Sequence, residues 1–336
     1  MISTLIALTI GLPWLGALAV WLLGDKRENW QHWTAICFSV ASAAVATMML
    51  WNASDQVGLS ISINNVVFGK FNFVADGLGV FLSVIATVIG SLAVIFSRSY
   101  MKGEAQLGRY YGFVLFFIGG MAGLVLTSNI MLMFLFWEIT ALCSYALIAF
   151  NNDDPKAVKG GIKALIITSI GGVGLLLGAL IMFAYTGSMD INNFMASVSD
   201  IPASILAVLA FGFLVAAAAK SAQFPFQTWL PDAMEAPSPI SALIHAATMV
   251  NAGVYLLARF YPVFKEVPYW REAVMIVGML SALLAAIMAL TAMDLKRVLA
   301  YSTVSQLGYM VYAVGAGSVF ASQFHLFSHS IFKALL

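Results

Sequence analysis

The sequence predicts an all-α polytopic membrane protein with about eleven transmembrane helices, one of them broken, and three observations support this fold class. Apolar side chains make up 62% of the 336 residues and charged side chains only 9%, whereas soluble domains carry roughly 25% charged residues. The mean hydropathy is +0.95. Apolar stretches of about 20 residues, long enough to span a bilayer, recur along the whole chain. We therefore expect the lipid bilayer to be its main surroundings.

The first predicted helix occupies residues 4 to 24. It is not expected to be a signal peptide, because no basic segment precedes it and its apolar stretch is about 20 residues long. Ten further helices are expected at residues 32 to 51, 76 to 97, 110 to 127, 129 to 150, 161 to 185, 203 to 222, 238 to 260, 272 to 292, 298 to 316 and 318 to 336. The last of them ends at Leu336 with no polar residue after Lys333. We expect that the native chain continues or that a second chain supplies the remaining helices.

The distribution of Lys and Arg among the connections predicts the orientation, because short cytoplasmic loops carry the excess. Ten of these residues fall on one set of connections and four on the other, which places the N-terminus outside. The inner set is Lys26, Arg27, Arg98, Lys102, Arg109, Lys156, Lys159, Lys163, Lys296 and Arg297. The outer set is Lys70, Arg259, Lys265 and Arg271. The alternation requires residues 203 to 236 to cross the membrane once.

Composition excludes several classes of function. The 16 basic and 15 acidic residues nearly cancel, so no basic excess is present to bind nucleic acid. The two cysteines, Cys37 and Cys143, lie in apolar runs without CxxC spacing, which fits neither a disulfide framework nor a zinc or iron-sulfur site. We expect no cofactor in this chain, so any redox centre belongs to a partner subunit.

Six ionisable side chains lie deep within the predicted helices, where a charge costs about 2.5 to 3.5 kcal/mol. They are Glu138, Lys220, His245, His325, His329 and Lys333. Such residues are functional candidates because they are expensive to bury. The structural alternative for Glu138 and Lys220 is an ion pair or a snorkelling lysine, although the chain after Lys220 stays rich in apolar residues. For His245 the alternative is a buried histidine with satisfied hydrogen bonds.

Three of these side chains share one face of the last helix. His325, His329 and Lys333 are spaced i, i+4 and i+8, so successive members are offset by only about 40°. Imidazole can pass a proton from one ring nitrogen to the other, which favours a proton relay with hydroxyl helpers such as Ser328. A two-histidine metal site is the alternative. It lacks a nearby carboxylate or cysteine ligand, and the lysine would repel a cation.

Four prolines predict the broken helix. Pro225, Pro231, Pro237 and Pro239 crowd the segment KSAQFPFQTWLPDAMEAPSP, and each removes a backbone N–H. Non-helical backbone within a bilayer is tolerated where protein or a water-filled cavity satisfies it, and it marks ion sites in transporters. Lys220 is then expected at the C-terminal end of the first half-helix. The alternative is an ordinary proline-rich loop.

Three segments closely resemble the antiporter-like subunits of complex I and its relatives. They are KSAQFPFQTWLPDAMEAPSPISALIHAATMVNAGVYLLARF, MDLKRVLAYSTVSQLGYM and HLFSHSIFKALL. The family includes large subunits of respiratory NADH dehydrogenase, Mrp-type cation/proton antiporters and proton-pumping modules of membrane-bound hydrogenases. The resemblance runs from about residue 70 to the end, and the histidine of ALIHAATMV points to the large L-type or A-type subunits.

The resemblance implies a fourteen-helix fold with two inverted five-helix repeats. Residues 1–109 would form helices 1 to 3, residues 110–260 the first repeat with its broken helix near 220–237, and residues 261–336 an incomplete second repeat. It also implies that Glu138 is the glutamate and Lys220 the broken-helix lysine of the first repeat. His245 then bridges to the relay of His325, His329 and Lys333.

Three further positions bear on the match to the family. Lys296 matches a family position, with an inner-loop charge as the alternative. The sequence TSIGGVG around residues 169 to 173 stands where many relatives carry a charged residue, which leaves the partners of Glu138 open. Asn251 replaces a lysine or threonine.

The resemblance favours a proton- or sodium-translocating membrane subunit of a redox-driven pump in a cell (inner) membrane. The complex would be an NADH-quinone oxidoreductase or a membrane-bound hydrogenase, with iron-sulfur, flavin or nickel-iron centres in the other membrane and peripheral subunits. Two alternatives remain, a subunit of an Mrp-type Na⁺/H⁺ antiporter and the membrane part of an inorganic-carbon uptake complex.

Overall fold

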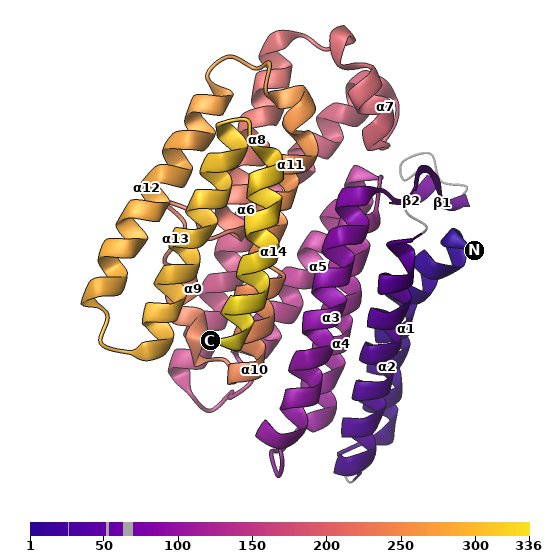
Figure 1. The fold of residues 1–336 in the computed structure, drawn as a ribbon, viewed down its shortest axis with the longest axis vertical. Helices are drawn as coiled ribbons and strands as arrows, with labels where there is room; N and C mark the ends of the chain where they lie inside the picture. Colours follow the sequence, from indigo (N-terminus) through magenta and orange to yellow (C-terminus); the bar gives the residue numbers. More distant parts are fainter. Residues whose placement is uncertain (26, 52–53, 63–69) are drawn as a thin grey trace.

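A computed structural model describes residues 1–25, 27–51, 54–62 and 70–336 as a bundle of long helices (Figure 1). The long helices are α1 (Ile2–Leu23), α2 (Glu28–Met49), α3 (Gly77–Tyr100), α4 (Leu107–Leu126), α5 (Ile130–Ile148), α6 (Pro155–Thr186), α8 (Ala203–Lys220), α11 (Asn251–Phe264), α12 (Trp270–Thr291), α13 (Leu295–Gly315) and α14 (Val319–Leu335). Each of the eleven predicted stretches corresponds to a helix or, in one case, to a helix with a break. The predicted all-α polytopic membrane fold is confirmed.

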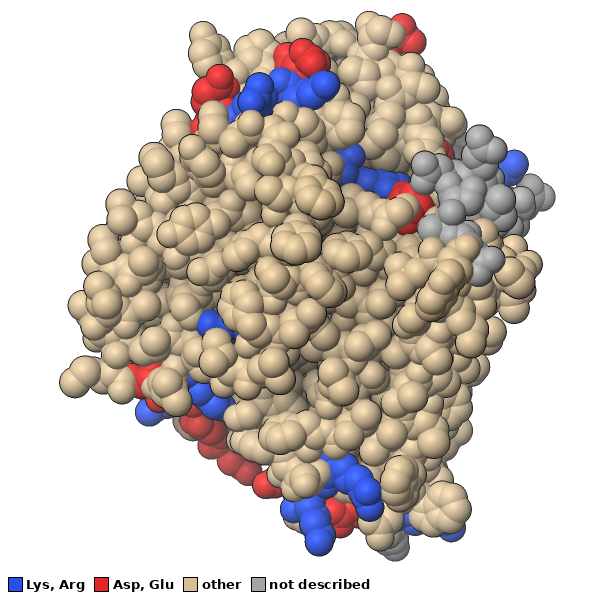
Figure 2. All heavy atoms as spheres, in the orientation of Figure 1, with Lys and Arg blue, Asp and Glu red and all other residues tan. Residues whose placement is uncertain are grey.

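Eight of the helices in the described ranges are long and apolar enough to cross a membrane by length and composition alone. The other predicted spans are α13, α14 and the segment that ends in α11. These elements are shorter or more polar, because they carry the buried histidines, lysine and amides described below. In the view of Figure 2 the charged side chains gather mainly near the two ends of the bundle, and the face between them is largely uncharged. This distribution suits a membrane-spanning protein.

Local sequence explains where several helices begin. The carboxylate of Asp76 accepts a hydrogen bond from the backbone N–H of Gly79 at 2.6 Å, and the amide oxygen of Asn129 accepts one from Leu132 at 3.0 Å. Asp154 caps α6 in the same way, with Pro155 at the first helical position. Side chains of this type satisfy N–H groups that have no partner within the helix. These polar residues therefore fix the boundaries of α3, α5 and α6.

The connections alternate between two ends of the bundle. The links α1–α2, α3–α4, α5–α6 and α12–α13 lie at the lower end in Figure 1, and the N-terminus and the link α11–α12 lie at the upper end. Residues 203 to 236 cross the bundle once, as the charge count requires. Arg259 was counted in an outer connection but lies within α11, and several other counted residues lie within the ends of helices, as Arg98 does in α3 and Lys156 in α6.

Two elements at the upper end were not predicted from the sequence. Strand β1 (Ser54–Ser62) pairs antiparallel with β2 (Lys70–Ala75) in the connection between α2 and α3. The short helices α7 (Ile191–Ala196) and η1 (Val198–Asp200) lie between α6 and α8. All lie outside the apolar stretches on which the prediction depended.

The predicted broken helix is present, and the break extends further than expected. After α8 ends at Lys220, the chain forms α9 (Trp229–Asp232), η2 (Ala233–Glu235), α10 (Ser238–Ser241) and a π-helical turn, η3 (Ala242–Ala247), before α11 begins. The prediction of a continuous helix over 238 to 260 is therefore wrong. The hydroxyl of Thr248 donates to the carbonyl of Leu243, five residues earlier, which favours π rather than α geometry.

Candidate functional site

Lys220 lies at the end of α8 and is fully buried. Its ammonium group donates a hydrogen bond of 2.8 Å to the backbone carbonyl of Trp137 on α5. The same nitrogen lies 4.9 Å from the centroid of the Trp137 ring, within the range of a cation–π interaction. The break in the helix thus places a lysine against both the backbone and the indole of the neighbouring helix.

Glu138 follows Trp137 on α5 and faces α6. Its Oε2 accepts a hydrogen bond of 3.0 Å from the hydroxyl of Ser169, and its Oε1 is buried without a hydrogen bond within the described part of the chain. The residues described include no ion pair between Glu138 and Lys220, since only four other pairs fall within 4.0 Å. The two charges still interact electrostatically. The glutamate and the lysine are thus linked through the peptide group of Trp137.

The glycine-rich sequence of α6 explains this arrangement. A Cβ atom at Gly172 would overlap with Oε1 of Glu138, and a Cβ atom at Gly171 would lie 2.5 Å from the Cβ of Ala219. Helix α6 therefore touches both α5 and α8 where it has no side chains. Where many relatives were expected to carry a charge, this chain has close helix contacts and a serine that binds the carboxylate.

His245 lies in the π-helical turn and is 2% exposed. Its ring centroid is 6.0 Å from that of Trp229. Neither ring nitrogen has a hydrogen bond of normal geometry to another described residue, and the backbone carbonyl of Ala233 lies near the ring. A buried imidazole of this kind has free capacity to accept or donate a proton.

Helix α14 packs against both the π-helical turn and α13. His325 shares a hydrogen bond of 2.7 Å between its Nε2 and the amide oxygen of Gln306 on α13. Lys333 donates to the hydroxyl of Ser302, also on α13. His329 is fully buried, and its ring centroid lies 6.4 Å from that of His325. The three side chains therefore face the bundle and not lipid.

A two-histidine metal site was the alternative to the relay at this place. Among the residues that the structure describes, no group of three or more His, Cys, Asp or Glu side chains is arranged to hold a metal ion. The contacts of His325 and Lys333 are instead with neutral polar side chains. Hydroxyls and amides offer both donors and acceptors of hydrogen bonds, so they can hold titratable side chains in position.

Several residues of the site were not singled out from the sequence. They are Trp137, through its carbonyl, and the neutral polar residues Ser169, Ser302 and Gln306. Asn251 was noted only as a departure, and it donates a hydrogen bond of 3.0 Å to Ser330 that joins α11 to α14. The sequence marks these neutral polar residues only as a serine or an amide inside an apolar helix. That signal is weak because such residues are cheap to bury when hydrogen-bonded.

Lys296 lies at the lower end of α13 and does more than add an inner-loop charge. Its ammonium group donates to the carbonyls of Met234 at 3.3 Å and Ala236 at 3.1 Å. These carbonyls follow the break in the helix and lack helical partners. Lys296 therefore holds the short helices of the broken segment in place.

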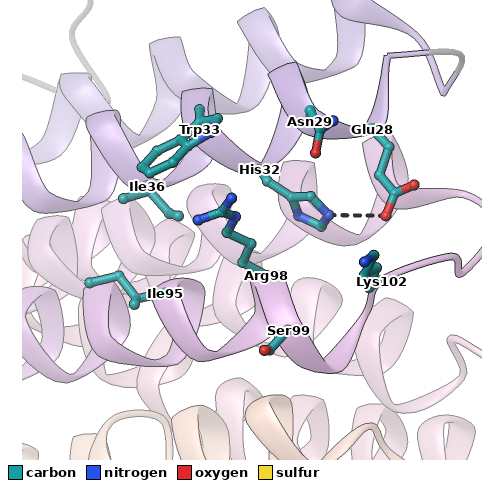
Figure 3. Close-up of a pocket in the computed structure, with 9 residues that line it drawn as sticks. All are labelled: Glu28, Asn29, His32, Trp33, Ile36, Ile95, Arg98, Ser99 and Lys102. Atoms are coloured by element: carbon teal, nitrogen blue, oxygen red, sulfur yellow. Dashed lines mark hydrogen bonds and ion pairs between the residues drawn. The ribbon is translucent and has the colours of Figure 1, made fainter.

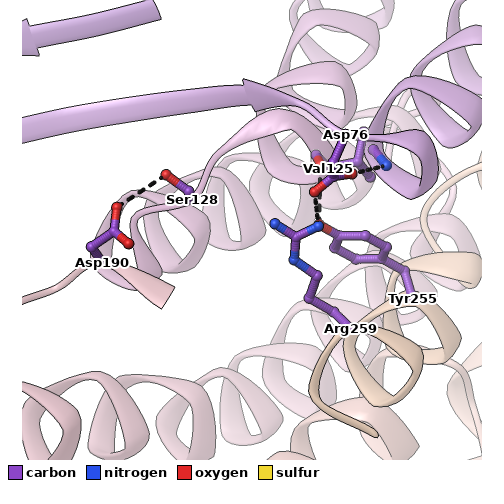
Figure 4. Close-up of polar contacts among 7 residues, drawn as sticks. Asp76, Val125, Ser128, Asp190, Tyr255 and Arg259 are labelled. Carbon is purple, nitrogen blue, oxygen red and sulfur yellow. Dashed lines mark hydrogen bonds and ion pairs between the residues drawn. The ribbon is translucent and has the colours of Figure 1, made fainter. Parts of the chain in front are cut away.

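A second polar cluster lies at the upper end (Figure 4). Arg259 forms an ion pair with Asp76, and both side chains are largely buried. The hydroxyl of Tyr255 donates to the carbonyl of Val125 at 3.0 Å. These contacts join α11 to α3 and α4. They place the charge of Arg259 in a structural pair, away from Lys220.

Two models of known protein families match this chain. Residues 127–336 match the family model described as NADH:quinone oxidoreductase/Mrp antiporter, transmembrane. Residues 61–111 match the model described as NADH-ubiquinone oxidoreductase (complex I), chain 5 N-terminus. The family predicted from the sequence motifs is confirmed.

Individual relatives cover nearly all of this chain. The chloroplastic NAD(P)H-quinone oxidoreductase subunit 5 of Acorus calamus is 39% identical over 325 residues, which are 93% of this chain and 44% of the relative. The NAD(P)H-quinone oxidoreductase chain 5 of Synechocystis is 41% identical over 300 residues, 88% of this chain and 43% of the relative. This chain thus spans less than half the length of these curated relatives.

Solved structures share the fold. A chain in the structure of the Mrp complex from Dietzia sp. superposes with a TM-score of 0.89 at 33% identity, over 98% of this chain and 36% of that one. A chain of the archaeal membrane-bound sulfane sulfur reductase superposes with a TM-score of 0.85 at 24% identity, over 98% of this chain and 69% of that one. The second match supports the fold alone.

Proposed function

Because the chain belongs to the NADH:quinone oxidoreductase/Mrp antiporter transmembrane family, we propose that it is a proton-translocating membrane subunit of a complex-I-like pump. The single observation that carries the proposal is the position of Lys220. It is fully buried at the end of a broken helix, and its ammonium group rests on the peptide that precedes Glu138. A titratable group held in this way can change its charge when the helices on either side shift.

The contacts of Lys220 define what its proton can do. The carbonyl and the ring of Trp137 stabilise the ammonium form, whereas burial opposes it. Glu138 adds a negative charge that Ser169 holds toward α6. A small shift of α5 against α8 would remove the carbonyl contact and release the proton. Moving one charge against 100 mV costs about 2.3 kcal/mol, which is comparable to a hydrogen bond to a charged group.

The released proton has acceptors further along the molecule. His245 is buried with unused ring nitrogens, and α14 packs directly against the turn that carries it. We propose that protons pass from Lys220 to His245 and then along His329, His325 and Lys333. Ser302 and Gln306 would hold the last two groups in place. The chain itself would carry out no redox chemistry.

The proposal extends to the partner subunits of the chain and to its orientation in the membrane. The relatives are named as parts of oxidoreductase and antiporter complexes, so we propose other membrane subunits as partners. Iron-sulfur, flavin or nickel-iron centres would lie in partner subunits of the complex. The excess of Lys and Arg at the lower end supports an N-terminus outside a cell (inner) membrane. The division into residues 1–109, 110–260 and 261–336 stays a prediction.

An Mrp-type Na⁺/H⁺ antiporter subunit is the second candidate function. The match to a chain of the Dietzia Mrp complex, at 33% identity over 98% of this chain, favours it. The two candidates differ in the driving force and in the ion. The inorganic-carbon uptake complex has no comparable observation in its favour.

Transport by the purified complex in sealed vesicles tests the proposal. The variant Lys220→Ala should lose proton uptake driven by NAD(P)H or by another electron donor, while a dye and ²²Na⁺ report protons and sodium separately. Lys265→Ala is the matched control, because that lysine is exposed at the upper end. Normal proton uptake by Lys220→Ala would refute the proposal. Electron-independent exchange of ²²Na⁺ for protons would instead support the antiporter.

A further inference from the structure

The lower ends of α2 and α3 enclose a cavity of about 600 Å³ that the proposed proton path does not use (Figure 3). Its polar wall includes Arg98 and Ser99 from the end of α3 and Lys102 from the connection that follows. Its apolar wall includes Trp33 and Ile36 from α2 and Ile95 from α3. Pockets that bind small ligands have volumes of roughly 300 to 1,000 Å³. The cavity is therefore large enough for a ligand with a polar head and an apolar part.

The charge of the cavity is positive on the side of α3. The guanidinium of Arg98 lies over the ring of Trp33, 4.4 Å from its centroid. Within the described ranges, neither Arg98 nor Lys102 forms an ion pair. Arginine stacked on an aromatic ring keeps its N–H donors in one plane, which suits a phosphate oxygen pair. Both cations are thus available to an anion.

The acidic side chain in the cavity is already engaged. Glu28 accepts a hydrogen bond of 2.9 Å from the backbone N–H of Gly103 and lies 3.3 Å from Nε2 of His32. The other ring nitrogen of His32 shares a hydrogen bond of 2.7 Å with the hydroxyl of Tyr111. Glu28 therefore weakens the positive field without neutralising Arg98 and Lys102.

The apolar wall opens onto an exposed apolar surface of the bundle. Trp33 is 50% exposed and Ile95 is 45% exposed, and Leu92 and Phe96 continue the same exposed surface up α3. Figure 2 shows Lys and Arg side chains at the lower end of the molecule beside this largely uncharged face. A ligand in the cavity would thus have its charged head at the end of the bundle and its apolar part against lipid-facing side chains.

We propose that this cavity binds an anionic phospholipid of the leaflet at the lower end. The phosphodiester lies between Arg98 and Lys102, the headgroup contacts Ser99, and an acyl chain follows Ile95 along α3. A soluble phosphate would use the two cations but would leave the apolar wall without a role. This site is independent of the proposed ion transport and assigns a function to the cations of the α3–α4 connection.

Lipid binding by the intact complex, measured by native mass spectrometry after delipidation, tests the proposal. The probes are phosphatidylglycerol and phosphatidylcholine with identical acyl chains. Each basic residue near an anionic headgroup strengthens binding about fivefold, so Arg98→Gln with Lys102→Gln should weaken phosphatidylglycerol binding by about thirtyfold and leave phosphatidylcholine unchanged. The control Lys156→Gln with Lys159→Gln removes two exposed cations from the same end, outside the cavity.

A variant with the opposite effect and a soluble competitor sharpen the test. Glu28→Gln keeps the acceptor for Gly103 but removes the negative charge, so it should strengthen phosphatidylglycerol binding several-fold. Glycerol 3-phosphate should compete poorly, because it lacks acyl chains. Any of five results would overturn the proposal. The two lipids could bind equally, the two double variants could lose equal affinity, or Glu28→Gln could bind phosphatidylglycerol more weakly. Glycerol 3-phosphate could compete strongly, or polypeptide density could fill the cavity.

Discussion

The ammonium group of Lys220 is hydrogen-bonded to the backbone carbonyl of Trp137 at 2.8 Å, and not to the carboxylate of Glu138. A backbone carbonyl cannot lose its partial charge, so this contact persists whatever the protonation state of the glutamate. The carboxylate instead acts on the lysine through space, from its position against α6. The carbonyl therefore fixes the position of the lysine, while the carboxylate acts on its charge without holding it in place.

Glu138→Gln should separate these two controls. The amide can still accept a hydrogen bond from Ser169, so the helices should pack as before and Lys220 should stay on Trp137. Proton uptake should fall at least tenfold, because the charge that acts on Lys220 is gone. Vesicle transport measures the rate, and a structure of the variant checks the lysine. Displacement of Lys220 from Trp137 would contradict the separation.

Gly172→Ala should disturb Glu138 without removing it. The added methyl group would overlap with Oε1 of the carboxylate, which must rotate away and lose the contact with Ser169. We expect transport to fall several-fold and the free energy of unfolding to fall by about 1 to 3 kcal/mol. Gly11→Ala is the matched control, since no atom lies within 4 Å of its added Cβ. Transport rates and thermal melting of both variants decide the point.

Thr248→Val should change the geometry of the π-helical turn. The substitution removes the hydroxyl that donates to the carbonyl of Leu243, while the side chain keeps its shape. A π-helical turn contains one residue more than an α-helical turn. If the turn relaxes to α geometry, His245 therefore rotates by the angle of one residue, about 100°, relative to α11. Proton transport should fall while the level of assembled complex stays unchanged. Thr47→Val, which removes a bond to a carbonyl four residues earlier within α2, should transport normally.

Arg259→Gln should destabilise the upper end of the bundle. The substitution leaves Asp76 largely buried without its partner, and breaking a buried ion pair in this way costs about 3 to 5 kcal/mol. Thermal unfolding should therefore begin at a lower temperature. Asp76→Asn retains an acceptor for the N–H of Gly79, so the double variant should recover part of the loss. Equal stability of the wild type and Arg259→Gln would show that the pair contributes nothing.

The sequence was sufficient to predict the long apolar helices and to single out the charged residues that lie deep within them. Helices α1, α3 and α12 could be predicted because a bilayer demands continuous apolar stretches. Lys220 and Glu138 stood out because few charges occur in such stretches. The neutral partners could not be identified in the same way, since Ser169 and Gln306 are ordinary residues until the fold brings α6 to α5 and α13 to α14.

Backbone partners and backbone geometry were also beyond the reach of the sequence. Nothing in the residues near Trp137 indicates that its carbonyl binds a lysine 83 positions away. In the π-helical turn, the hydroxyl of Thr248 donates to the carbonyl five residues earlier, one position beyond the usual acceptor. The β1–β2 hairpin was missed because its residues lie in a connection outside the apolar stretches. The contact between Lys220 and Trp137 is decided by tertiary structure and not by local pattern.

Two lysines from neighbouring helices hold the lower end of the broken segment. Lys296 on α13 holds the carbonyls of Met234 and Ala236, and Lys163 on α6 forms a 2.7 Å ion pair with Asp232. The short helices between α8 and the π-helical turn are thus tethered from both sides. A displacement that begins at α13 pulls on the same few residues as one that begins at α6. We therefore expect a displacement of α6 or of α13 to reach Lys220, at the end of α8, through this segment.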